Sequence, residues 1–391
     1  MMRKRSRPAL LAAIASASVL LAGCTTTSGN GGSGGGDGAA TDTIRTTIDI
    51  PSGFDPTQAL SLPDFVLGHV SYDTLVRRDE SGVIGGLATE WETTPNSATF
   101  TLRDDAVCAD GTEITPTIVK DSLDYYVGSS ASGTATVFGP GNTITVTADD
   151  SAGTVTVDLS GPWPDLLNGL TIGSTGIICP AGLADPEALA AGEATGAESG
   201  PYVLESAEAG VRYTYTLRDD YAAWPEWSGI EGTPAKTIEF VVSPDSSATA
   251  NLVLSGQLDI AKIQAESMSR FDGMDDHEIT VNRFSDFYVI FNQRESSPFT
   301  DPALRKAVAQ VLDREAFENI TSSGTGEISG NMVAADTQCA VDNTANLIPL
   351  DPEAAAGVLD GVTIRIVGPQ IMGPAGAGNE YAQEVLRAAG A

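Results

Sequence analysis

The stretch GLATEWETTPNSATFTLRDDAVCADGT occupies residues 86–112 and does most to decide the fold of this chain. Residues 98–102 are rich in β-branched and aromatic side chains, which predicts a strand, and Asp110-Gly111 is a dipeptide typical of tight turns. Thr115 and Pro116 then supply a hydroxyl cap and a first-turn proline, so we expect a helix from there to residue 126. The stretch therefore leads from a strand through a turn into a helix.

Strand and helix patterns alternate on both sides of this stretch. Period-two or β-branched runs predict strands at 43–50, 143–148, 154–159, 213–217, 237–242, 287–291 and 362–367, of which 143–159 form a hairpin. Helical periodicity and end signals predict helices at 60–76, 246–255, 301–318 and 380–389. This mixture is typical of an α/β or mixed α+β protein. About 350 residues are more than one core accommodates, so we expect two or more lobes.

Four segments of the chain resemble family 5 of the bacterial extracellular solute-binding proteins. The longest is the stretch at 86–112, which follows that family's pattern over nearly its whole length. Each short motif also has a structural explanation, because Gly256 fits a helix C-cap and Asp110-Gly111 fits a turn. The motifs therefore identify the fold more than they indicate contacts with a solute. The other three segments follow in the family's order: SGPYVL at 199–204, LSGQLDIA at 254–261, and FNQ, PFTDP, LRKA and DRE between 291 and 315.

The resemblance implies a two-lobed clamp like that of the periplasmic binding proteins, with an extra subdomain in the first lobe. Lobe I would span 43–292, with the subdomain at about 90–195, and 293–391 would form part of lobe II. The solute would lie between the lobes, which close around it by a hinge motion. Because family members are longer, we expect lobe II to be incomplete in the sequence as given.

The N-terminus carries a secretory signal followed by a lipidation motif. Basic residues precede an apolar run at 9–22, which is too short to span a bilayer, since a spanning helix takes about 20 apolar residues. The signal at 1–23 ends in Leu-Ala-Gly before Cys24, which resembles the bacterial lipobox; an ordinary signal peptide with a chance cysteine is the alternative. Residues 24–42 are polar and predict a flexible tether. We therefore expect a diacylated Cys24 to anchor the protein to the outer face of the cell membrane.

Charge and motifs exclude several classes of function. The formal net charge is −31, and removal of the signal with its four basic residues makes it −35, a surface that repels nucleic acid and anionic lipids. The sequence contains no Gly-x-Ser-x-Gly, His-Glu-x-x-His or Walker pattern. With 52 acidic residues, a close carboxylate pair is inevitable and carries no information about catalysis. We predict a protein that is not an enzyme and needs no cofactor.

Three cysteines remain once Cys24 carries the lipid. In an oxidising compartment we expect Cys108 and Cys179 to form a disulfide and Cys339 to stay unpaired, although the sequence does not fix the connectivity. Metal binding is disfavoured, because no Cys-x-x-Cys spacing occurs and only two histidines could assist. We therefore predict no metal site.

The resemblance also supplies candidate solute contacts. Phe54 follows the first predicted strand, and Phe287, Tyr288 and Asn292 precede the crossing into lobe II; alternation along a strand would turn either Phe287 or Tyr288 toward the solute. The implied function is that of a monomer that captures a small solute, above all an oligopeptide. It would deliver this solute to the permease and ATPase subunits of an ABC importer. The alternative is a surface receptor or sensory lipoprotein that uses the same clamp without transport.

Overall fold

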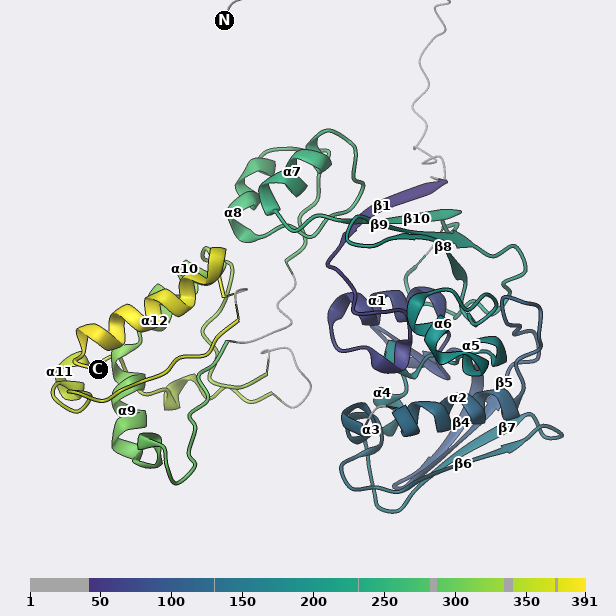
Figure 1. Ribbon diagram of the computed structural model, residues 1–391, viewed down its shortest axis with the longest axis horizontal. Helices are drawn as coiled ribbons and strands as arrows, with labels where there is room; N and C mark the ends of the chain where they lie inside the picture. Colours follow the sequence, from purple (N-terminus) through teal and green to yellow (C-terminus); the bar gives the residue numbers. More distant parts are fainter. Residues whose placement is uncertain (1–41, 130, 231, 282–286, 334–339, 370–371) are drawn as a thin grey trace, which may run out of the picture. The chain divides into compact units, whose positions relative to one another are not determined.

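The computed structural model describes residues 42–129, 131–230, 232–281, 287–333, 340–369 and 372–391. These residues form three β-sheets surrounded by helices, which confirms the predicted mixed α/β class (Figure 1). The predicted signal peptide, Cys24, nearly all of the tether and Cys339 lie outside the described residues.

The first sheet joins strands from distant parts of the chain. Strand β1 pairs in parallel with β10, whereas β10–β9 and β9–β8 are antiparallel. Helix α1 (Leu62–Ser71) packs against β8, and its Leu67 shares a buried core with Tyr215 and Phe240 of the sheet (Figure 1). The predicted strands at 43–50, 213–217 and 237–242 are thus confirmed within a few residues. The sheet order is β1 (Thr43–Ile48), β10 (Thr237–Val242), β9 (Arg212–Leu217) and β8 (Tyr202–Glu208).

The second sheet is antiparallel and contains the stretch on which the fold prediction rested. Its order is β4 (Ala88–Thr94), β5 (Ser97–Leu102), β7 (Thr154–Leu159) and β6 (Ile144–Asp149). Asp149 pairs with Thr154, which confirms the predicted hairpin. Helix α2 (Pro116–Ser129) covers one face of this sheet, so Val119 and Leu123 are buried with Phe100 and Val157 (Figure 1).

Gly86 of the Gly-Leu-Ala motif lies where an added Cβ would clash with the carbonyl oxygen of Thr74, which explains why this position requires glycine.

A third sheet and four short helices complete this part of the chain. The third sheet is the hairpin of β2 (Val76–Asp79) and β3 (Gly82–Gly85). The short helices are α3 (Ala131–Phe138), α4 (Leu166–Gly169), α5 (Pro180–Ala184) and α6 (Pro186–Ala191).

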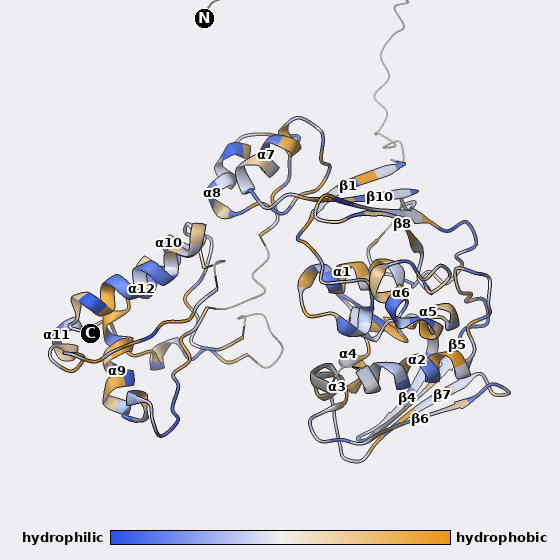
Figure 2. Ribbon diagram, in the orientation of Figure 1, coloured by the Kyte–Doolittle hydropathy of each residue, from blue (hydrophilic) through white to orange (hydrophobic). Residues whose placement is uncertain are grey.

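The C-terminal third of the described chain is helical and builds a core of its own. Val308 and Val311 pack there with Leu359 and Leu386, and Figure 2 shows polar and apolar residues side by side along α12. None of the helices in the described ranges combines the length and the apolar character needed to cross a membrane. The helices are α7 (Ser246–Leu254), α8 (Ala265–Met268), α9 (Pro302–Val311), α10 (Arg314–Ser322), α11 (Pro352–Ala355) and α12 (Ala377–Ala388).

Two predicted helices have different bounds in the structure. The single helix predicted at 301–318 is wrong, because α9 ends at Val311 and α10 begins at Arg314. The side chain of Asp313 accepts hydrogen bonds from the N–H groups of Glu315 and Ala316, so this residue caps a new helix instead of continuing the old one. The helix predicted at 60–76 runs only over α1, since Tyr72 is already extended, with φ −128°.

The two strands predicted at 287–291 and 362–367 are absent from the structure. Both runs are apolar, yet Ile290 is 78% and Val367 91% exposed. A run of β-forming residues becomes a strand only when a second backbone satisfies its N–H and C=O groups. The residues of both runs do favour a strand, but a local sequence pattern does not show whether a second strand lies beside them.

Candidate functional site

The loop between β1 and α1 is held in one conformation by the buried carboxylate of Asp64. That carboxylate accepts hydrogen bonds from the backbone N–H groups of Ser52 (2.8 Å), Leu60 (3.0 Å) and Ser61 (3.0 Å), and from the hydroxyl groups of both serines (2.9 and 2.8 Å). Burial acts to raise the pKa of Asp64, but the hydrogen bonds from Leu60, Ser52 and Ser61 outweigh it and lower the pKa. The loop is therefore pre-organised by an ionised group.

A second buried carboxylate, Asp55, fixes the tip of the same loop. It accepts from the backbone N–H (2.9 Å) and hydroxyl (2.7 Å) of Thr57, and from the hydroxyl of Tyr125 on α2 (2.9 Å). Burial and this bond to Asp55 raise the pKa of Tyr125 to about 12. The loop is thus fastened to the helix that covers the second sheet.

Phe54, the first predicted solute contact, lies on the inner side of this loop. Its ring packs edge-on against Tyr213, with centroids 5.8 Å apart, and its N–H donates to the carbonyl oxygen of Ala190 at 3.1 Å. The apolar side chains that the loop exposes are Ile50 (64%) and Leu60 (81%), and Leu62 (53%), the first residue of α1, is exposed next to Leu60. From the sequence we had placed Ile50 in the first strand and Leu60 in the helix. The Ser61-x-x-Asp64 capping box was the available signal, because it places Leu60 ahead of the helix.

Phe287, Tyr288 and Asn292 lie in an irregular segment of the chain. Phe287 is 43% exposed and contacts Phe317 with ring centroids 6.3 Å apart, while Tyr288 is 51% exposed. The expected alternation, with one ring inward and one outward, is therefore wrong, because no strand forms there. Asn292 is exposed, and its Oδ1 accepts from the N–H of Arg294 at 3.2 Å.

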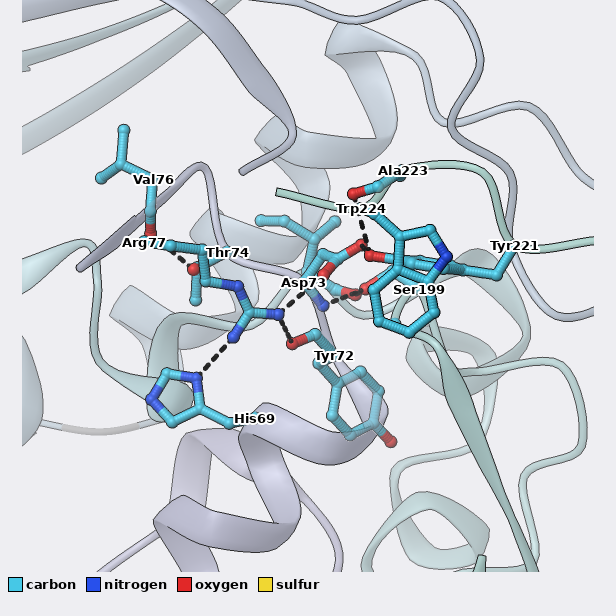
Figure 3. Close-up of polar contacts among 12 residues, drawn as sticks. His69, Tyr72, Asp73, Thr74, Val76, Arg77, Ser199, Tyr221, Ala223 and Trp224 are labelled. Carbon is cyan, nitrogen blue, oxygen red and sulfur yellow. Dashed lines mark hydrogen bonds and ion pairs between the residues drawn. The ribbon is translucent and has the colours of Figure 1, made fainter. Parts of the chain in front are cut away.

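A buried charge network lies where α1 meets β2 (Figure 3). Arg77 donates to the carboxylate of Asp73 at 2.7 Å, to the carbonyl oxygen of Tyr72 at 3.2 Å, and to Nδ1 of His69 at 2.7 Å. The hydroxyl of Tyr221 donates to the second oxygen of Asp73 at 2.8 Å. Burial raises the pKa of Asp73, whereas the charge of Arg77 opposes that rise. The ionised form of Asp73 is therefore stabilised by its contacts with Arg77 and Tyr221.

His69 accepts from Arg77 and must be neutral to do so. Burial and the neighbouring Arg77 charge lower the pKa of His69 to about 4. In the unfolded chain the pKa returns to about 6.5, so between these values the unfolded state binds the extra proton. We expect the free energy of unfolding to fall by about 1.4 kcal/mol per pH unit as the pH drops through this window.

The variant His69→Asn keeps an acceptor for Arg77 and removes the titration. Denaturant unfolding of both proteins from pH 7 to pH 4 should give curves that diverge below pH 6.5. All carboxylates titrate in both proteins, so the difference isolates His69. Parallel curves would contradict the prediction.

The same network supports an exposed aromatic side chain. Tyr221 contacts the indole of Trp224 edge-on, with ring centroids 4.7 Å apart, and Trp224 is 38% exposed. Figure 3 shows the two rings side by side next to Asp73. The guanidinium of Arg103 donates to the carbonyl oxygens of Ala222 (3.3 Å) and Trp224 (3.4 Å), which holds this segment in place.

Cys108 and Cys179 form a disulfide, the pairing that we expected from the sequence. Both residues are fully buried, and Arg218 donates to the carbonyl oxygens of Cys108 (2.8 Å) and Val107 (3.0 Å) beside the bond. In the part of the chain that the structure describes, no group of three histidine, cysteine, aspartate or glutamate side chains could hold a metal ion.

Residues 82–370 match the model of the bacterial extracellular solute-binding proteins, family 5 Middle. The chain therefore belongs to this family of extracellular solute-binding proteins. It is similar to a substrate-binding protein from Microbacterium hydrocarbonoxydans, whose crystal structure contains 4-hydroxybenzoate hydrazide. The two are 49% identical with a TM-score of 0.81, over 90% of this chain and 73% of that one.

Two curated proteins of Escherichia coli (strain K12) are more distant relatives. The periplasmic murein peptide-binding protein MppA is 26% identical over 310 residues, or 73% of this chain. The probable D,D-dipeptide-binding periplasmic protein DdpA is 27% identical over 295 residues, or 71% of this chain. This chain spans 55% and 54% of their respective lengths.

Proposed function

We propose that this protein is the extracytoplasmic solute-binding component of an ABC importer, which captures a small solute and delivers it to a membrane permease. The observation that carries the proposal is the family match over residues 82–370. Its two lobes would be 43–292 and 293–391, and a lipid on Cys24 would keep the protein on the outer face of the membrane.

An oligopeptide is the first solute class that we propose. It is supported by the murein peptide and dipeptide named for the two Escherichia coli relatives. A small aromatic acyl hydrazide is the second, supported by the 49% identity to the protein that holds 4-hydroxybenzoate hydrazide.

Thermal unfolding of the full chain with each solute distinguishes these classes. A ligand at 100 times its dissociation constant adds about 2.7 kcal/mol to the free energy of unfolding, so a bound solute gives a clear rise in melting temperature. A rise with tri- and tetrapeptides alone supports the oligopeptide, and a rise with 4-hydroxybenzoate hydrazide alone supports the aromatic class. No rise with either, nor with sugars or metal chelates, would contradict solute capture.

The proposed contacts in the irregular segment need a matched comparison. Tyr288→Ala and Asn292→Ala should weaken binding of the solute found above, whereas Val289→Ala, at a residue 58% exposed in the same segment, should leave it unchanged. Equal affinities for all three variants would remove Tyr288 and Asn292 from the site.

Uptake of labelled solute separates import from the receptor alternative. Cells that lack the gene should lose uptake at low solute concentration and regain it with the gene restored. Unchanged uptake, together with binding by the pure protein, would favour a sensory lipoprotein.

We predict that Cys24→Ala releases the protein from the membrane. The lipid on Cys24 is what would hold the protein on the membrane. The variant should therefore move from the membrane pellet to the medium or the soluble extracytoplasmic fraction. Immunoblots of the fractions test this, with Cys339→Ala as the control that stays in the pellet. A Cys24→Ala protein that sediments with membranes as the wild type does would refute the lipid anchor.

A further inference from the structure

A chain of hydrogen bonds ties the β1–α1 loop, residues 49–61, to the C-terminal end of helix α2. The hydroxyl of Tyr125 on α2 donates to one carboxyl oxygen of Asp55 at 2.9 Å, and the hydroxyl of Thr57 donates to the other at 2.7 Å. The hydroxyl of Ser129, also on α2, donates to that of Thr57 at 3.0 Å. The side-chain amide of Gln58 donates back to the carbonyl oxygen of Ser129 at 3.3 Å. The bonds therefore run without a break from the helix to the tip of the loop.

The two side chains of α2 that make these bonds lie on one face of the helix. Tyr125 and Ser129 are four positions apart, a spacing that places side chains above one another on a helix. The neighbouring Tyr126 lies on a different face, because it is buried in the core of the second sheet, where its ring contacts Phe138 edge-on. The helix thus packs on the sheet with one face and holds the loop with another.

The loop end of this chain of bonds is shielded from water. Asp55 and Thr57 are only 7% and 1% exposed, and the ring of Tyr125 packs against the small core that contains Ile178 and Leu189. A buried acceptor that loses its donor also loses its compensation for desolvation. The Tyr125–Asp55 bond should therefore contribute strongly to the order of the loop.

The same loop carries Phe54, the first candidate solute contact. Its N–H donates to the carbonyl oxygen of Ala190 on α6 at 3.1 Å, while Ile50 and Leu60 of the loop are exposed. Tyr125 and Ala190 both lie within the range 90–195 that the sequence predicts as an extra subdomain. The placement of Phe54 therefore depends on elements outside the first sheet.

We propose that α2 braces the β1–α1 loop for solute capture, and that Tyr125 is the positioning residue of this brace. The inference rests on the proposed function, since it assigns the loop to the solute site. A loop that is already ordered loses less conformational entropy when a ligand binds, so the brace raises affinity without any contact between Tyr125 and the solute. Helix α2 thus contributes to binding from outside the site.

Hydrogen exchange of the full chain, without any solute, tests the brace. Tyr125→Phe removes the hydroxyl and keeps the ring, so peptides covering residues 50–61 should exchange about tenfold faster, the expected effect of one lost hydrogen bond. Peptides from β10 should not change, which excludes global unfolding as the cause. Tyr126→Phe is the matched control, because it removes a hydroxyl from the face of α2 that packs on the second sheet. Equal loop exchange in Tyr125→Phe and the wild type would overturn the proposal.

Two substitutions at Thr57 separate the hydrogen bonds from packing. Thr57→Val removes the hydroxyl that joins Asp55 to Ser129 and should also speed exchange of the loop. Thr57→Ser keeps this hydroxyl and should retain most of the protection. The same acceleration in both variants would show that the methyl group, and not the chain of bonds, orders the loop.

Solute affinity tests the positioning role. Titration of the full chain with 4-hydroxybenzoate hydrazide and with a tripeptide, at a temperature where every variant is folded, should give a dissociation constant about three- to tenfold higher for Tyr125→Phe than for Tyr126→Phe and the wild type. A loss of global stability alone leaves the affinity of a folded protein unchanged. Faster loop exchange with unchanged affinity would therefore refute the role in capture. A wild type that binds neither probe would count against the proposed function, while the exchange result would still decide the brace.

Discussion

Replacing Arg77 by leucine is expected to lower the free energy of unfolding by about 3–5 kcal/mol, because it leaves a buried carboxylate without its partner. Asp73 and Arg77 have side chains only 1% and 7% exposed, and they are 2.7 Å apart. The Nε of Arg77 has no hydrogen-bond partner among the described residues. The hydrogen bonds to Asp73, Tyr72 and His69 must therefore offset the free-energy cost of burying the guanidinium. Urea or guanidinium denaturation of the variant measures the loss.

Arg78 is the matched control for this substitution. It follows Arg77 in β2 but is exposed, and its guanidinium donates to the side chain of Asn168 at 2.7 Å. Arg78→Leu should therefore change the free energy of unfolding by no more than about 0.5 kcal/mol. Combining Arg77→Leu with Asp73→Asn should recover part of the loss, because the uncompensated charge is removed. Equal effects of Arg77→Leu and Arg78→Leu would contradict the energetic role of the pair.

Replacing both Cys108 and Cys179 by alanine is expected to cost about 4 kcal/mol in the chain-entropy model. The two residues are 71 positions apart in the sequence, so loss of the bond opens a long loop in the unfolded chain and raises the conformational entropy of that state. Each single alanine variant should lose nearly as much as the double variant, because either one breaks the same bond. Denaturant unfolding without reductant provides the measurement.

Cys339→Ala is the control for the disulfide and should unfold like the wild type. Peptide mapping without reductant should recover one peptide pair joined through Cys108 and Cys179. Recovery of both as free thiols, or a Cys339→Ala variant as unstable as Cys108→Ala, would contradict the pairing.

Local signals in the sequence were sufficient for most elements of the first two sheets. The hairpin at 143–159 carried alternating apolar residues and a turn, and its strands form within one residue of the predicted bounds. Asp313 is the instructive exception among the helices. An aspartate followed by a glutamate is a start signal as strong as the helical periodicity that runs through it, and the start signal prevailed.

The candidate solute contacts were less predictable than the fold. The resemblance selected the loop after the first strand, but not which of its side chains turn outward. Phe54 packs inward because Asp64 and Asp55 fix the loop around it, and these carboxylates act through bonds to residues up to 70 positions away. Hydrophobic periodicity contains no information about hydrogen bonds between distant residues. The exposure of Leu60 and Leu62 therefore became evident only in the structure.

The sequence by itself determined the family, the mixed α/β class and most strands of the first two sheets, because periodicity, turn residues and motif order are local properties of the chain. Only the tertiary structure decided that Asp73, Arg77, His69 and Tyr221 share one buried network, and that the runs at 287–291 and 362–367 have no strand partner. Burial and backbone pairing depend on residues far apart in the sequence, and a local pattern specifies what a segment can form without specifying what it meets.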